Sequence, residues 1–115
     1  MARPQVPSIP ERLDAHSDVT GKGVVVAFVD SGFYPHSDLM RPRRRVRAYA
    51  DATRDVPVGT EFFTAQSFSW HGTMTACAAC GNGYASGGVY RGIASDADVV
   101  LIKARNDAGR IRGKS

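Results

Sequence analysis

Residues 24–32, VVVAFVDSG, are the stretch that decides the fold of this 115-residue chain. The run from 24 to 29 is apolar and mostly β-branched or aromatic, without polar alternation, which is typical of a strand covered on both faces in a parallel sheet. It begins after a turn at Gly21–Gly23 and ends abruptly at Asp30, which Ser31 and Gly32 follow. The stretch therefore predicts a buried strand with Asp30 at its carboxyl end.

Outward from this strand, the sequence alternates further strands and helices. The expected elements are a short helix at 9–13, a weak strand at 46–49, a long loop at 51–69, a helix at 70–80 and a second buried strand at 99–102. Such alternation favours an α/β fold with a parallel sheet and right-handed crossovers. In open sheets of this kind functional groups gather beyond the carboxyl ends of the strands. This rule makes Asp30 the first candidate site residue.

The composition is that of a folded domain, since 43% of the residues are apolar and 23% are charged. Residues 1–8 are Pro-rich and polar and predict an extended arm, whereas residues 9–115 read as one domain without repeats or linkers. No apolar run approaches the roughly 20 residues of a membrane helix. The N-terminus shows no secretory signal. The chain as written is therefore expected to be cytoplasmic and to have no membrane partner.

A second candidate, His71, opens the helix expected at 70–80. A histidine in the first turn feels the positive end of the helix dipole, which favours the neutral imidazole that a general base needs. A buried carboxylate on the other ring nitrogen fixes the tautomer and stabilises the imidazolium. Taken singly, Asp30 reads equally well as a turn cap or ligand contact, and His71 more often as a capping or packing residue. Taken together, they are two parts of a hydroxyl-activating relay.

Three motifs resemble the subtilase family of serine proteases, and they occur in that family's order. The matching segments are VVVAFVDSGFYPHSDL at 24–39, HGTMTA at 71–76, and Gly92-Ile93-Ala94 followed by the strand at 99–103. They resemble the family's D-S/T-G segment with its H-P-D-L, its H-G-T-H-V-A motif, and its G-V-A-P with the strand after it. The sequence departs from these patterns at Ser37, Met74, Thr75 and Ser95.

The resemblance covers about residues 9–115, the early part of a subtilase catalytic domain. It implies an incomplete subtilisin-like, three-layer αβα fold and serine endopeptidase activity on peptides or proteins, with Asp30 orienting His71 as the general base and acid. The family's nucleophilic G-T-S-M-A segment and its oxyanion Asn segment are absent from this sequence. Because triad members act as a unit, the chain alone is expected to be inactive. A fragment, an interrupted gene and a split protein completed by a second chain all fit.

Some members of the family bind calcium, and Asp38 matches a carboxylate used for that purpose. Backbone oxygens of the loop at 81–90 would have to supply the other ligands. Calcium takes about six to eight oxygens, and one carboxylate is a small part of that set. No cofactor or metal is therefore assigned from the sequence, and calcium stays an expectation of the resemblance.

A non-catalytic binding module is the alternative function. The chain has a net charge of +4, and Arg41–Arg47 carries five arginines, which would suit nucleic acid, although a solvated surface loop is favoured. The C-terminal Gly113-Lys114-Ser115 is a relaxed match to a phosphate-binding loop without its helix. The pair Cys77 and Cys80 lies inside the expected helix, where packing of two thiols is favoured over a redox pair or half a zinc site.

Overall fold

The computed structural model of the chain describes residues 6–54 and 66–105. The elements in chain order are α1 (Ile9–Arg12), β1 (Val25–Asp30), α2 (Ser37–Met40), β2 (Val46–Asp51), α3 (Ser69–Cys80), the short 3-10 helix η2 (Tyr84–Ser86) and β3 (Asp98–Lys103). Each strand and helix expected from the sequence is present, with bounds shifted by one or two residues. No helix in the described part of the chain is long and apolar enough to cross a lipid bilayer.

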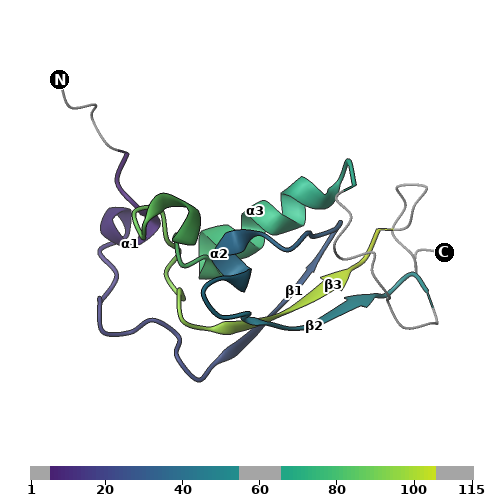
Figure 1. Ribbon diagram of the computed structural model, residues 1–115, viewed down its shortest axis with the longest axis horizontal. Coiled ribbons are helices and arrows are strands. Elements are labelled where there is room, and N and C mark those ends of the chain that lie inside the picture. The colour runs from purple at the N-terminus through teal and green to yellow at the C-terminus, as the bar shows by residue number, and fades with distance from the viewer. Residues whose placement is uncertain (1–5, 55–65, 106–115) are drawn as a thin grey trace.

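The three strands form one parallel sheet in the order β1-β3-β2, so the last strand lies in the middle. Asp30 and Asp51, which end the two outer strands, are both in register with Lys103, which ends the central one. This arrangement confirms the predicted α/β fold and is consistent with an incomplete subtilisin-like architecture. The carboxyl ends of all three strands consequently lie at the same end of the sheet (Figure 1).

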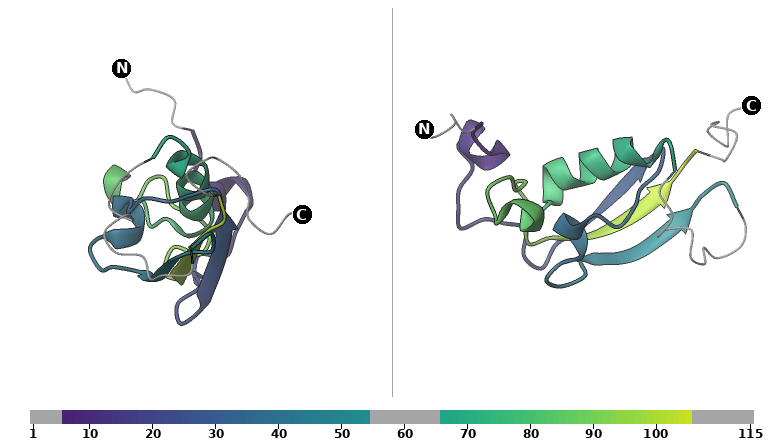
Figure 2. Two further views of the ribbon diagram at one scale, coloured as in Figure 1. Left: turned by 90° about the vertical axis from the view of Figure 1, so that its right-hand side faces the viewer. Right: turned by 45° about the horizontal axis from the view of Figure 1, so that its top comes forward.

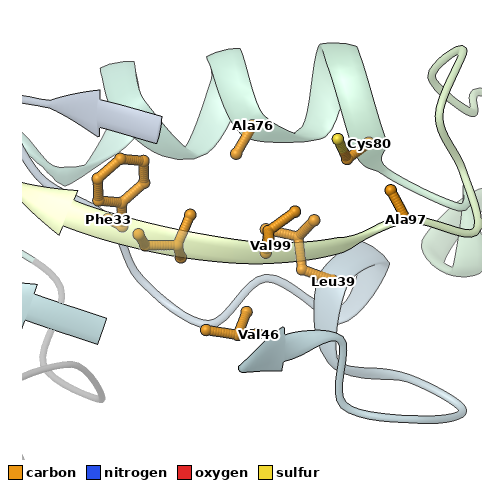
Figure 3. Close-up of a cluster of buried hydrophobic side chains, with 8 residues drawn as sticks. Phe33, Leu39, Val46, Ala76, Cys80, Ala97 and Val99 are labelled. Carbon is orange, nitrogen blue, oxygen red and sulfur yellow. The ribbon is translucent and has the colours of Figure 1, made fainter. Parts of the chain in front are cut away.

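Helix α3 covers one face of this sheet (Figures 1 and 2). Its buried residues Ala76 and Cys80 face Val99 of β3 across the core (Figure 3), and Leu101 of β3 belongs to the same buried cluster. Burial of these side chains is the main force that holds the helix on the sheet, at about 25 cal/mol for each Å² of apolar surface removed from water. The remaining members of the buried cluster are Phe33, Leu39, Val46 and Ala97.

Close contact between α3 and the loop after β1 depends on a glycine. A Cβ atom added at Gly72 would lie 2.1 Å from the carbonyl oxygen of Gly32 and 2.8 Å from the Phe33 ring. Only a residue without a side chain allows the two backbones to approach this closely. The Gly of the His71-Gly72-Thr73 segment thus sets the distance between the helix and the end of β1.

The prediction that β1 is covered on both faces is wrong for the described part of this chain. Its residues alternate between exposed and half-buried, and Val25 and Val29 remain 47% and 66% exposed. Hydrogen bonds from Asp98 N–H to the Val24 carbonyl and from Ala104 N–H to the Asp30 carbonyl bracket the ladder with β3. Because a parallel ladder engages alternate residues, the backbone groups of 25, 27 and 29 point to the open edge of the sheet.

The prediction that Arg41–Arg47 forms a solvated surface loop is also only partly correct. Arg45 is 3% exposed, and its guanidinium donates hydrogen bonds to three backbone carbonyls, those of Ala97 at 2.6 Å, Asp38 at 2.6 Å and Cys80 at 2.7 Å. Burial lowers the pKa of Arg45 from its ordinary value. This side chain therefore connects α2, the end of α3 and the start of β3, instead of lying in water.

Helix α2 is an element that the sequence analysis did not predict. His36 precedes it, and the His36 Nδ1 atom accepts a hydrogen bond of 3.0 Å from the Asp38 N–H, which satisfies a free donor of the first turn. Leu39 on this helix is fully buried in the core. The four-residue element thereby contributes Leu39 to the same buried cluster as Ala76 and Cys80 of α3.

Candidate functional site

Asp30 and His71 meet at the carboxyl edge of the sheet, although 41 residues separate them in the chain. Asp30 is the last residue of β1, and His71 lies in the first turn of α3. The His71 Nδ1 atom is 2.8 Å from the Asp30 Oδ1 atom. The Asp30 side chain is 16% exposed and the imidazole 52% exposed. The structure thus brings the two residues singled out by the sequence into direct hydrogen-bonding contact.

Thr73 holds the start of α3 in this position. Its hydroxyl donates a hydrogen bond of 2.7 Å to the Ser69 carbonyl and accepts one of 3.0 Å from the Tyr34 N–H. Thr73 is 3% exposed, so both bonds are shielded from water. The first turn of α3, with His71 in it, is therefore fastened to the loop that follows β1.

The carboxylate of Asp30 is kept ionised by its neighbours. Burial by itself would raise the pKa of Asp30, but hydrogen bonds from the Ser31 N–H at 2.6 Å, from His71 and from the Ser31 hydroxyl at 3.0 Å lower it below the ordinary value of 3.8. An ionised carboxylate can only accept hydrogen bonds. In the neutral imidazole the nitrogen that donates to this carboxylate is Nδ1, and Nε2 carries the lone pair.

A cavity of about 650 Å³ lies beside this pair. It is lined by Val29, Asp30, Ser31, Phe68, Trp70, His71, Ala104 and Arg105. The Trp70 ring lies edge-on to the imidazole, with 5.3 Å between the ring centroids and 73° between the planes, and the Trp70 side chain is 60% exposed. Asp30 and His71 thus line a cavity whose other walls are largely apolar, as is usual for ligand sites.

Sequence reasoning missed three of these lining residues, Phe68, Trp70 and Arg105. The first two precede His71 by three and one positions, so the start of α3 carries them to the same place. Arg105 follows the carboxyl end of β3. The rule that functional groups gather at the carboxyl ends of parallel strands, applied to β3 as it was to β1, would have pointed to Arg105.

The two cysteines of α3 have the environment of packing residues. Cys80 is buried in the core and Cys77 is half-buried, and both thiols are free. Burial raises the pKa of Cys77 to about 12 and also raises that of Cys80. A thiol that stays protonated near neutral pH is a poor nucleophile and a poor metal ligand. The Gly113-Lys114-Ser115 turn lies outside the described residues.

The calcium expectation rests on the carboxylate of Asp38, which has two close neighbours in the structure. Its Oδ1 atom accepts a hydrogen bond of 2.8 Å from the Ala85 N–H, and the His36 Nδ1 atom lies 3.7 Å from the same oxygen. Within residues 6–54 and 66–105 there is no group of three or more His, Cys, Asp or Glu side chains that could hold a metal ion. The Ala85 amide engages one of the two Asp38 carboxylate oxygens, and calcium stays an expectation of the resemblance.

Sequence comparison identifies the class of protein to which this fold and this site belong. The subtilase family of peptidases matches residues 21–114. The chain belongs to the subtilase family. It is 38% identical over 91 residues to the serine protease AprX of Bacillus subtilis (strain 168), an alignment that covers 79% of this chain and 19% of AprX. The chain therefore spans about a fifth of the length of this relative.

Proposed function

We propose that this chain supplies the acid–base half of a subtilisin-type serine endopeptidase site. The observation that carries the proposal is the 2.8 Å contact between His71 Nδ1 and Asp30 Oδ1. In this arrangement Nε2 of His71 takes the proton of an attacking hydroxyl and later delivers it to the leaving amine. Asp30 holds the tautomer and stabilises the imidazolium that forms between the two steps. Peptide or protein substrates follow from this chemistry and from the family.

The nucleophilic Ser, in this proposal, comes from a part of a subtilase domain that does not align with these 115 residues. It is carried either by the same polypeptide in its natural form or by a second chain. The alignment leaves about four fifths of AprX unmatched, which provides ample sequence for the nucleophile. Without that residue no acyl-enzyme forms, so the isolated chain hydrolyses no peptide.

A chimera tests the proposal directly. Residues 21–114 of this chain replace the corresponding segment of AprX, and hydrolysis of a peptide anilide is measured. We expect an active chimera. Asp30→Asn should lower kcat by about 10⁴-fold, as the same change does in a Ser-His-Asp triad, and His71→Ala by at least as much. His36→Ala is the matched control, because His36 caps α2 and does not line the cavity beside Asp30 and His71, and it should retain most of the activity.

Two results would contradict the proposal. One is a folded chimera, judged by circular dichroism, that does not cleave peptides at all. The other is an active chimera that Asp30→Asn and His71→Ala leave unchanged. Hydrolysis by the isolated 115-residue chain would refute the second part of the proposal, namely that the nucleophile lies elsewhere.

Nucleic-acid binding by Arg41–Arg47 has less support in the structure than in the sequence. Arg45 is buried. Arg43 and Arg47 lie 3.1 and 3.9 Å from the carboxylate of Asp98. Arg44 donates a hydrogen bond of 2.9 Å to the Val46 carbonyl. Four of the five arginines are thus engaged within the chain, and we do not propose this function.

A further inference from the structure

The cavity beside Asp30 and His71 is also lined by a guanidinium. Arg105 follows the carboxyl end of β3, and its Cζ atom lies 5.1 Å from the centroid of the Phe68 ring. The Arg105 Nε atom is buried and has no hydrogen-bond partner within the described residues. An unsatisfied buried donor is costly to a folded protein unless a ligand or water completes it. No hydrogen bond joins any Arg105 guanidinium nitrogen to the described residues, so the guanidinium has unused donor capacity beside the cavity.

The carboxylates near this end of the sheet are already occupied. Asp30 accepts from Ser31 and His71. Asp51 lies 3.7 Å from the Lys103 Nζ atom and 3.3 Å from the Arg54 Nε atom. Within residues 6–54 and 66–105, no carboxylate forms an ion pair with Arg105. A positive charge without a matching carboxylate therefore borders the cavity.

The surroundings of Arg105 suit a planar anion. A guanidinium presents its donors in a rigid fork that matches a carboxylate, and stacking on an aromatic ring holds the plane of that fork. Val29 and Trp70 line the same cavity and present apolar surface beside the guanidinium. A carboxylate that enters the cavity thus meets a cation next to apolar side chains.

We propose that Arg105 forms a carboxylate-binding subsite next to the Asp30–His71 pair, and that it selects peptides with a Glu or Asp side chain. That the bound peptide is also cleaved rests on the proposed function. Binding of its carboxylate by Arg105 does not depend on that function. The guanidinium fixes an acidic side chain of the peptide while the backbone of the peptide lies against His71. The substrate class is therefore acidic peptides.

Trp70 provides the assay, because it is the only tryptophan of the chain and lines the same cavity. Its emission is followed while the 115-residue chain is titrated with two tetrapeptides that differ only in Glu against Gln. Both are N-acetylated and C-amidated, so that the Glu side chain is the only carboxylate. The Glu peptide should bind about tenfold more tightly, from the strength of hydrogen bonds to charged groups. Added salt should reduce the difference.

Arg105→Gln should abolish this preference for Glu, and Arg105→Lys should retain part of it. Arg91→Gln is the matched control, since Arg91 lines a different cavity of about 530 Å³ near α1 and should leave the preference unchanged. Circular dichroism of each variant shows that it is folded. Equal responses of the unmodified chain to both peptides, including no response to either, would overturn the proposal. So would a Glu preference that persists in Arg105→Gln.

The AprX chimera separates this proposal from the proposed function. A chimera that cleaves peptides but shows equal kcat/KM for Glu and Gln substrates, together with equal binding by the chain, refutes the subsite and leaves the peptidase function standing. A chimera without activity, together with Arg105-dependent binding of the Glu peptide, refutes the peptidase function and leaves the subsite standing.

Discussion

Replacing Arg45 by methionine tests how much of the fold depends on one buried side chain. Methionine keeps the apolar stem of the arginine but donates no hydrogen bonds. The three bonds of 2.6–2.7 Å to the carbonyls of Asp38, Cys80 and Ala97 are lost. The Asp38 carbonyl keeps a second donor, the N–H of Asn82 at 3.1 Å. The loss therefore falls mainly on the carbonyls of Cys80 and Ala97.

The magnitude follows from these two acceptors. Each buried polar group left unpaired costs about 1–3 kcal/mol, and the two together about 2–6 kcal/mol. Removing a buried charge that no carboxylate contacts offsets part of this cost, as the lowered pKa of Arg45 indicates. We expect Arg45→Met to lower the free energy of unfolding by about 3 kcal/mol, a large share of the 5–15 kcal/mol of an ordinary domain.

Urea unfolding followed by circular dichroism measures this change. The matched control is Arg43→Met, because Arg43 is an arginine of the same loop whose side chain is 63% exposed and pairs with Asp98 at 3.1 Å. A surface pair of this kind contributes less than about 1 kcal/mol. If Arg45→Met and Arg43→Met change the free energy of unfolding by the same small amount, the stabilising role assigned to the buried guanidinium is wrong.

Three further predictions concern the end and the open edge of β1. The lowered pKa of Asp30 means that its contribution to stability is present above pH 3.8 and is lost as the pH falls through the lowered value. As the pH is lowered, the urea midpoint of the unmodified chain should thus fall more steeply than that of Asp30→Asn. An equal dependence of the two midpoints on pH would contradict the stabilising role of the Asp30 carboxylate. Gly72→Ala should destabilise the chain by about 2 kcal/mol in the same assay, because the added Cβ meets the Gly32 carbonyl; an unchanged midpoint would show that the helix can shift. Val29→Lys should reduce self-association in sedimentation experiments more than Ala50→Lys on β2, since a charge protects an exposed strand edge from pairing with another chain. Equal effects of the two variants would mean that self-association does not use the edge of β1.

The elements with a strong local pattern were predictable from the sequence. Apolar runs identify β1 and β3, and an Ala-containing run with few breakers that ends at Gly81-Asn82-Gly83 identifies α3, because these signals depend only on neighbouring residues. The parallel arrangement followed from the alternation of strands and helices. Helix α2 was missed because four residues are too few to show a helical period, and its cap, His36, is not among the usual capping residues.

Features that depend on distant parts of the chain were not predictable. The apolar run of β1 shows that its residues suit a covered strand, but not which segments are present to cover them. Burial of Arg45 depends on carbonyl groups 35 and 52 residues further along the chain, and no local pattern reveals them. Clustered arginines are usually solvated, so the sequence pointed the other way.

For the candidate site, the sequence pointed to the two acid–base residues but not to their surroundings. Asp30 and His71 each stand at a recognisable place, a strand end and a helix start, and their motifs resemble a known family. Trp70 and Arg105 have no motif of their own. Their importance appears only when the ends of β1 and β3 and the start of α3 lie around the same cavity.

Under the proposed function, the edge of β1 that is open among the described residues links completion of the sheet to catalysis. The exposed Val25 and Val29 lie along this edge, and the strand ends at Asp30. A parallel strand that pairs there hydrogen-bonds to the free backbone groups of 25, 27 and 29 and ends on the same side of the sheet as Asp30. Under the proposed function, the sheet and the active site are then completed in the same step of folding. A nascent or partly folded protease built this way cannot cleave other proteins, because its general base has no nucleophilic Ser to activate until the sheet is complete.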